Sequence, residues 1–259
     1  MKVTATQLPG EITDLDHAWE QLVQHCDEHR PDLVVLPEVP FAPWPFSTPR
    51  FDVDTWRGVV GAHESWIGRL GELDVPAVVG SQPVTDAGNR YNESFVWTGD
   101  AGLRPVHRKS YLPDEEGFWE ASWYRTGDAS FPTLAVGDAT AGIMLCTEVW
   151  FSEHARELGA GGAQIVAVPR ATERSSVERW IAAGRVAAMR AGAFCISSNR
   201  GGHEERTGID WGGAGWIIDP AGEVLATTSD AEPFVTLDVE LAVSDHAKTT
   251  YPRNTVGPA

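Results

Sequence analysis

The sequence predicts a layered α/β fold, with helices on the outside and β-sheets inside. Short, uninterrupted apolar runs such as residues 33–36 are typical of strands that are buried on both faces. Segments with the apolar periodicity of an amphipathic helix lie between these runs. The alternation of the two patterns recurs in both halves of the chain, which favours helices packed against sheets.

The first half contains three predicted strands, two helices and one hairpin. The first helix carries its apolar side chains on one face, at Leu15, Ala18, Trp19, Leu22 and Cys26. The hairpin turns through residues 99–102. We expect strands at 3–7, 33–36 and 77–80, helices at 14–30 and 56–73, and the hairpin at 92–97 and 103–108.

The second half repeats the alternation and then becomes rich in strands. An ordered loop is expected at 110–128, before the first strand of this half. We expect strands at 141–145, 165–168 and 194–198, helices at 152–158 and 177–190, and a final β-rich section at 214–218, 223–226 and 234–237.

The chain is long enough for one large domain. Its 259 residues are 42% hydrophobic, which suffices for a sizeable core, and no linker or low-complexity tract divides them. We therefore expect a single domain over residues 1–259, with its core at about 1–240. The polar tail at about 241–259 is expected to dock on a partner subunit or to stay loose.

Charge and cysteine content exclude several classes of protein. The formal net charge of -17 repels phosphate backbones, so nucleic acid is not an expected partner. No segment resembles a signal peptide or a membrane span, so no membrane association is expected. The three cysteines, Cys26, Cys146 and Cys195, are far apart and lack CxxC spacing. This pattern argues against disulfides and a structural metal site, and it favours a cytoplasmic location.

Three reactive side chains stand at the ends of predicted strands: Glu38, Lys109 and Cys146. Such ends meet at one edge of layered α/β sheets, where functional groups gather. A nearby ammonium group lowers the pKa of a thiol, and a carboxylate can take the thiol proton and return it to a leaving amine. The trio therefore predicts nucleophilic catalysis by Cys146.

Several segments together resemble the nitrilase superfamily of carbon-nitrogen hydrolases. The three signature segments are LPE at 36–38, HRKSYLP at 107–113 and GIMLCTE at 142–148. Further similarity lies in the same order along the chain, at 162–169, 185–191, 199–202 and 217–222. The chain is thus identified as a candidate amidase-type member of this superfamily.

The resemblance implies a four-layer αββα sandwich that pairs as a homodimer with an αββααββα core. It implies a Glu-Lys-Cys triad that needs no metal and no organic cofactor. Cys146 would attack a small-molecule amide, and Glu38 would act as general base and then as acid. Lys109 and the backbone N–H of Thr147 would hold the oxyanion.

Members of this superfamily carry a second glutamate after the lysine. Two residues are candidates here. Glu120 follows Gly117-Phe118-Trp119, whereas Glu116 precedes the same residues in a stretch that resembles aliphatic amidases. We favour Glu120.

The chain departs from its relatives around the expected pocket. Nitrilases proper have a Trp after the nucleophile, whereas Thr147 here favours amides over nitriles. The paired arginines of D-carbamoylases are replaced by Val149 and Trp150, and we expect Trp150 to form an apolar pocket wall. Arg170 stands where relatives have a small or polar residue. It would either bind a substrate carboxylate or, as we favour, pair with Glu148 or Glu173.

The sequence leaves several functions open. The leading hypothesis is hydrolysis of a small linear amide, of the ω-amidase or N-carbamoyl-amine type, through a thioester and with release of ammonia. The alternatives are a nitrilase that makes an acid and ammonia, and a catalytically silent member that only binds ligands. A papain-like protease would need a histidine beside Cys146, and His154 is an unpersuasive candidate.

Overall fold

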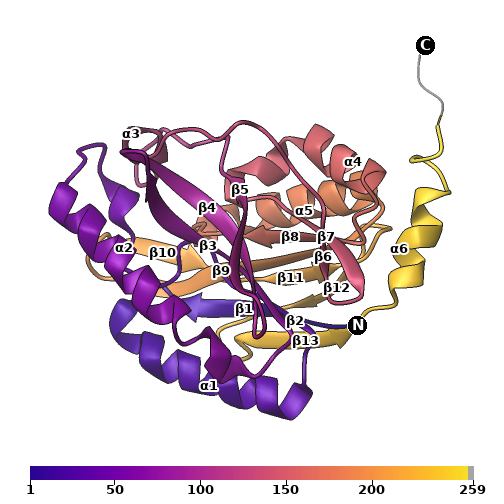
Figure 1. Ribbon diagram of the computed structural model, residues 1–259, viewed down its shortest axis with the longest axis horizontal. Helices are drawn as coiled ribbons and strands as arrows, with labels where there is room; N and C mark the ends of the chain where they lie inside the picture. Colours follow the sequence, from indigo (N-terminus) through magenta and orange to yellow (C-terminus); the bar gives the residue numbers. More distant parts are fainter. Residues whose placement is uncertain (256–259) are drawn as a thin grey trace.

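A computed structural model describes residues 1–255 of the chain (Figure 1). Its helices are α1 (Leu15–His29), α2 (Val53–Ile67), α3 (Glu120–Trp123), α4 (Ser152–Ala160), α5 (Val177–Ala191) and α6 (Leu241–Lys248). Its strands are β1 (Lys2–Pro9), β2 (Leu33–Val35), β3 (Ala77–Asp86), β4 (Asn89–Thr98), β5 (Gly102–Arg108), β6 (Leu134–Val136), β7 (Ala139–Ile143), β8 (Ile165–Pro169), β9 (Phe194–Glu204), β10 (Ile209–Gly212), β11 (Trp216–Ile218), β12 (Val224–Thr227) and β13 (Phe234–Asp238).

The strands form two halves of similar construction that are joined at one end. Their hydrogen-bonded order is β5-β4-β3-β2-β1-β9-β8-β7-β6. β1, β2 and β3 are parallel, as are β7, β8 and β9, while β4, β5 and β6 are antiparallel neighbours. The halves meet where Gln7 of β1 pairs with Asn199 of β9. The carboxyl ends of β2, β7 and β8 therefore lie near one junction.

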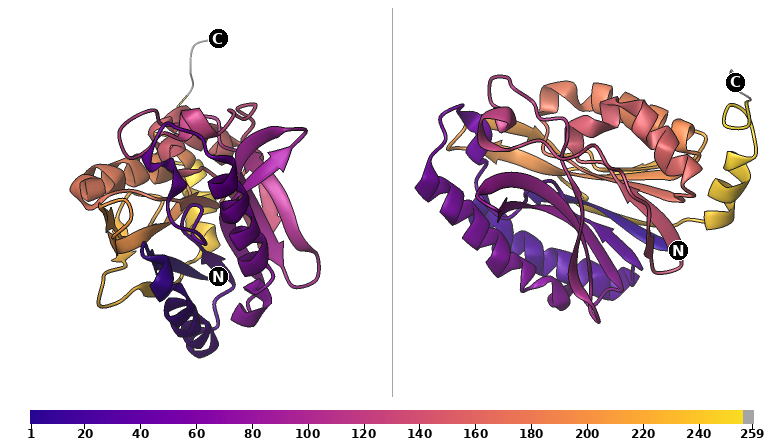
Figure 2. Two further views of the ribbon diagram at one scale, coloured as in Figure 1. Left: turned by 90° about the vertical axis from the view of Figure 1, so that its left-hand side faces the viewer. Right: turned by 45° about the horizontal axis from the view of Figure 1, so that its top comes forward.

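The two halves stack face to face, with helices on both outer sides. In the right-hand view of Figure 2, α1 and α2 cover one side and α4 and α5 the other. Buried side chains fill the space between the sheets, among them Val3, Val35 and Val79 on one side and Ile143, Ile165 and Ile196 on the other. This arrangement confirms the predicted αββα sandwich.

The helices pack as their sequences predict. Leu15, Trp19, Leu22 and Cys26 of α1 are all buried, as expected for an amphipathic helix on a sheet. The buried face of α5 consists of small residues. A Cβ at Gly184 would lie 2.7 Å from the Trp216 ring, so glycine is what allows α5 to approach this indole.

Several element boundaries differ from the predictions. The predicted helix at 56–73 ends at Ile67, and a separate 3₁₀ turn covers Leu70–Leu73. β3 continues into a long hairpin with β4 that the sequence did not suggest. The predicted tail from residue 241 begins with α6, which contacts its own chain: Ser244 Oγ donates to Gly192 O at 2.7 Å. Docking of the tail on a partner subunit stays a prediction. Residues 256–259 lie outside the described part.

Across residues 1–255, the structure contains no helix that is long and apolar enough to span a bilayer.

Candidate active site

Glu38 stands just after β2 in a tightly held turn. Its backbone N–H donates to Arg170 O at 3.0 Å, and the side chain is fully buried. The next residue, Val39, has a left-handed φ of 44°, and its N–H donates to Ser81 Oγ at 3.0 Å. These contacts turn the chain away from the strand and leave the Glu38 carboxylate inside the protein.

Lys109 follows β5 and joins two carboxylates. Its ammonium donates to Glu38 Oε1 at 2.8 Å and to the two oxygens of Glu120 at 2.7 and 2.9 Å. Asn92 contacts both Lys109 and Glu38. Its backbone carbonyl accepts from the backbone N–H of Lys109 at 2.8 Å, and its side-chain NH₂ donates to Glu38 Oε1 at 2.8 Å. The side chains of Lys109, Glu38 and Glu120 are each no more than 1% exposed.

The close contacts in this cluster shift the pKa values of Lys109 and Glu120. Burial alone would lower the pKa of Lys109, but the carboxylates of Glu120 and Glu38 outweigh burial and raise it. Burial raises the pKa of Glu120 to about 7, against the pull of Lys109 and with a further rise from Glu38. Two carboxylates that share one ammonium titrate as a coupled unit, so a proton is held there close to neutral pH.

Cys146 begins a 3₁₀ turn, Cys146–Trp150, three residues beyond the end of β7. Its φ of 48° is left-handed, a conformation that side chains other than glycine rarely adopt and that is typical of functional turns. The residue is only 4% exposed. The chain therefore holds the thiol in a strained elbow.

The thiol form of Cys146 is favoured in this setting. Burial, and then the negative charge of Glu38, raise the pKa of Cys146, while Lys109 opposes them. A buried thiol needs a base before it can attack. Glu38 Oε2 is a buried oxygen without a hydrogen-bond partner among the described residues. Since buried polar atoms are normally paired, this oxygen is available for a proton or a ligand.

The structure distinguishes the two candidates for the second glutamate. Glu120 begins α3, is 1% exposed and contacts Lys109, whereas Glu116 is exposed. The structure thus brings together Glu38, Lys109, Glu120 and the Cys146 elbow.

Two predicted pocket residues, Trp150 and Thr147, lie in the 3₁₀ turn of Cys146. Trp150 is 48% exposed and packs edge-on against Trp180 of α5, with ring centroids 5.3 Å apart. Its role as an apolar pocket wall stays a prediction. Thr147 directly follows Cys146 in the 3₁₀ turn, and the first N–H groups of a helical turn lack intrahelical acceptors.

The prediction that Arg170 pairs with Glu148 or Glu173 was wrong. Within residues 1–255, no carboxylate lies at ion-pair distance from its fully buried guanidinium. The group donates to neutral oxygens and stacks on an indole: Ser197 Oγ at 2.7 Å, Thr172 Oγ1 at 2.8 Å, Ala214 O at 2.9 Å and the Trp216 ring at 4.0 Å. Burial lowers the pKa of Arg170 to about 9.

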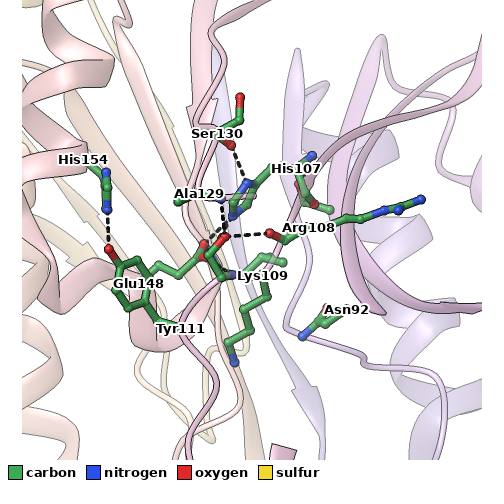
Figure 3. A network of polar contacts seen from close by, with 12 residues as sticks. Asn92, His107, Arg108, Lys109, Tyr111, Ala129, Ser130, Glu148 and His154 are labelled. Atoms are coloured by element: carbon green, nitrogen blue, oxygen red, sulfur yellow. Dashed lines mark hydrogen bonds and ion pairs between the residues drawn. The ribbon is translucent and has the colours of Figure 1, made fainter. Parts of the chain in front are cut away.

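Sequence reasoning missed a second buried ion cluster beside the first (Figure 3). Glu148, two residues after Cys146, contacts the imidazole of His107, two residues before Lys109, at 2.8 Å. The sequence contained one indication of this cluster: His107 and Glu148 are each only two residues from a candidate catalytic side chain. Asn92 was missed too, although it contacts both Lys109 and Glu38.

No metal centre is indicated in the part of the chain that the structure describes. Within it, no three His, Cys, Asp or Glu side chains are grouped so as to hold a metal ion.

A sequence profile of the carbon-nitrogen hydrolase family matches residues 2–249 of this chain. N-carbamoylputrescine amidase from Oryza sativa subsp. japonica is 31% identical over 159 residues, which cover 55% of this chain and 52% of that protein. The chain thus spans about half the length of this relative. A nitrilase from Pyrococcus abyssi is 25% identical over 236 residues, which cover 90% of this chain and 86% of that protein.

Solved structures share the fold. A carbon-nitrogen hydrolase from Helicobacter pylori superposes with a TM-score of 0.87 at 23% identity, over 98% of this chain and 94% of that one. A mutant amidase from Nesterenkonia sp. AN1 has a TM-score of 0.76 at 21% identity, over 94% of this chain and 92% of that one. That amidase carries the acetamide moiety of fluoroacetamide, covalently added at its active-site cysteine.

Proposed function

The chain belongs to the carbon-nitrogen hydrolase family, and from this membership and the site geometry we propose that it hydrolyses the C–N bond of a small linear amide and releases ammonia. One observation carries the proposal. The buried Glu38 carboxylate is bound to Lys109 through Oε1, while Oε2 has no partner among the described residues. A carboxylate held in this way beside a buried thiol is suited to proton transfer.

The first step forms a covalent bond to the enzyme. As the Cys146 sulfur attacks the amide carbon, Glu38 Oε2 takes the thiol proton and the carbonyl oxygen becomes an oxyanion. The Lys109 ammonium and the Thr147 N–H stabilise this negative charge. Because the pKa of Cys146 is raised, deprotonation accompanies the attack instead of preceding it.

The second stage breaks the C–N bond and restores the enzyme. Glu38 gives its proton to the leaving nitrogen, so that ammonia departs and a thioester remains on Cys146. Glu38 then takes a proton from water, and the resulting hydroxide attacks the thioester. Collapse of this intermediate releases the carboxylic acid, and the thiolate recovers the proton from Glu38. Glu120 keeps Lys109 oriented throughout.

The named relatives support amide chemistry without identifying the substrate. N-carbamoylputrescine amidase acts, by its name, on an N-carbamoyl amine, and the Nesterenkonia adduct places the acetamide moiety of fluoroacetamide on the active-site cysteine of that protein. The Pyrococcus relative is named a nitrilase and matches more of the chain. Nitrile hydrolysis is therefore the second candidate function, although Thr147 replaces the Trp expected after a nitrilase nucleophile.

Substrates with short, similar alkyl chains separate the two functions. We would incubate the enzyme with butyramide, butylurea or butyronitrile and measure both ammonia and the organic product. The proposal predicts ammonia from butyramide or butylurea, no turnover of butyronitrile, and no activity in Cys146→Ala. Production of butyric acid from butyronitrile, with both amides left intact, would favour the nitrilase alternative.

Assembly and location are part of the same proposal. We propose a homodimer, supported by exposed apolar side chains on the α5 side of the sandwich: Trp150, Val186 and Met189. Light scattering on the purified protein should give twice the 28.1 kDa chain mass. A cytoplasmic location is supported by the free thiols of Cys26, Cys146 and Cys195, and cell fractionation would test it.

A further inference from the structure

A single carboxylate connects the two segments that carry the ammonium and the thiol (Figure 3). Glu148 Oε1 accepts from the backbone N–H of Ser110 at 2.7 Å, and Oε2 accepts from the N–H of Leu145 at 2.7 Å. Ser110 follows Lys109, and Leu145 precedes Cys146. Because Glu148 is fully buried, both hydrogen bonds are shielded from water.

The same carboxylate binds His107, whose ring is held from both sides. His107 Nε2 lies 2.9 and 2.8 Å from the two Glu148 oxygens, and Nδ1 lies 2.7 Å from Ser130 O. The ring therefore has a polar contact at each nitrogen, and these contacts fix its position and orientation between Glu148 and Ser130.

Glu148 also closes the turn around the strained cysteine. Its own N–H donates to Leu145 O at 3.1 Å, while its side chain takes the N–H of Leu145. This reciprocal pair encloses Cys146, whose φ is 48°. A backbone conformation of this kind persists only where surrounding contacts fix it.

We infer that His107 and Glu148 form a positioning ion pair that sets the place of Cys146 relative to Lys109. The inference rests on the proposed function for its kinetic consequences only. Neither side chain touches the reacting atoms, and both act through the backbone neighbours of Lys109 and Cys146.

Glu148→Gln tests the inference with little change of shape. The new NH₂ group cannot accept a hydrogen bond, so Ser110 or Leu145 loses its acceptor and His107 loses its counterion. A shift of about 1 Å at a reacting group can lower the rate about 100-fold. We expect kcat to fall by about this factor, with KM changed less than about threefold.

His107→Gln and the double variant show whether the two residues act as one unit. Each single change breaks the same pair, so the double variant should lose about as much kcat as Glu148→Gln alone. His154→Gln is the matched control. His154 is another largely buried histidine, it contacts Tyr111 and Glu157, and neither of its ring nitrogens reaches Glu148. We expect its kcat to change less than about twofold.

Two further readouts do not depend on amide hydrolysis. Alkylation of Cys146 by iodoacetamide, followed by peptide mass spectrometry, should slow at least about tenfold in Glu148→Gln and stay unchanged in His154→Gln. Nitrogen NMR of the labelled histidines should show a shifted His107 Nε2 signal in Glu148→Gln, because this nitrogen contacts Glu148, and an unchanged signal in His154→Gln. These results stand even if the wild-type enzyme hydrolyses no amide, which would contradict the proposed function alone.

The inference fails if Glu148→Gln folds with wild-type kcat and alkylation rate. It fails equally if the His107 signals are the same in Glu148→Gln and in the wild-type protein. If Glu148→Gln does not fold, as judged by circular dichroism, the kinetics and the alkylation rate of His107→Gln decide.

Discussion

Two buried ion clusters lie side by side in this protein, and they differ in how completely their polar atoms are paired. In the Lys109 cluster, Glu38 Oε2 and Asn92 Oδ1 lack partners among the described residues. In the His107–Glu148 cluster, both carboxylate oxygens and both ring nitrogens have partners. Unpaired buried atoms cost stability, whereas a fully paired network adds rigidity. The difference separates the cluster suited to chemistry from the one suited to alignment.

Replacing the unpaired oxygen, Glu38 Oε2, should have the largest effect on kcat. Glu38→Gln keeps the size of the side chain but cannot take the Cys146 proton. General acid–base catalysis contributes about 10²–10⁴-fold, and Glu38 acts in both stages, so we expect kcat to fall by about 10⁴. Steady-state ammonia release measures this, with Glu116→Gln as the exposed control. A loss under tenfold would show that another group is the base.

The pH dependence of kcat/KM should show how Glu120 affects Glu38 in the Lys109 cluster. The pKa of Glu120 is raised to about 7. Below that pH the two carboxylates hold an extra proton, so Glu38 is less able to accept one, and kcat/KM should decrease as the pH falls through about 7.

Glu120→Gln should move this decrease in kcat/KM to lower pH, because Glu38 then faces Lys109 without a second carboxylate. We also expect a loss of about 10² in kcat, since Lys109 is less firmly oriented. A pH-rate profile of both proteins gives the answer. An unchanged decrease would place the titrating group elsewhere.

Arg170 extends the comparison, because it is a buried cation whose partners are all neutral. Arg170→Met removes three hydrogen bonds from β9 and its surroundings, and we expect the free energy of unfolding to drop by about 2–4 kcal/mol in urea titrations. KM for neutral and acidic amides should change by the same factor. A rise confined to acidic amides would show that Arg170 binds a substrate carboxylate.

Trp150 should have the smallest effect. Because its indole is about half exposed and packs on Trp180, Trp150→Ala should lower the free energy of unfolding by about 1 kcal/mol. KM for butyramide should not change. An increase of about tenfold in KM would place Trp150 in the substrate pocket.

Local patterns predicted much of the fold and the candidate site. The apolar runs at 33–36 and 165–168 became β2 and β8, because strands buried on both faces need continuous apolar sequence. Glu38, Lys109 and Cys146 follow such strands or a hairpin, and the sheets bring these ends together. Glu120 begins α3 within the segment 110–128, which shows no clear period in the sequence, yet its position after Lys109 was enough to select it.

Other features depend on contacts that local patterns do not encode. His107 and Glu148 are separated by 41 residues and meet only because β5 and β7 end at the same place. Arg170 has neutral partners from three segments, which no spacing rule indicates. α6 was missed because its exposed face is polar, although Ser244 and Ala247 pack against the chain.

The formation of a covalent intermediate on Cys146 tests the central claim most directly. We would mix the wild-type enzyme with butyramide, quench in acid during turnover and determine the mass of the peptide that contains Cys146. The thioester forms in every turnover, so the account predicts a butyryl adduct on Cys146. The adduct should be absent from Glu38→Gln, which cannot take the thiol proton. An unmodified peptide, together with full ammonia release by Cys146→Ala, would contradict it.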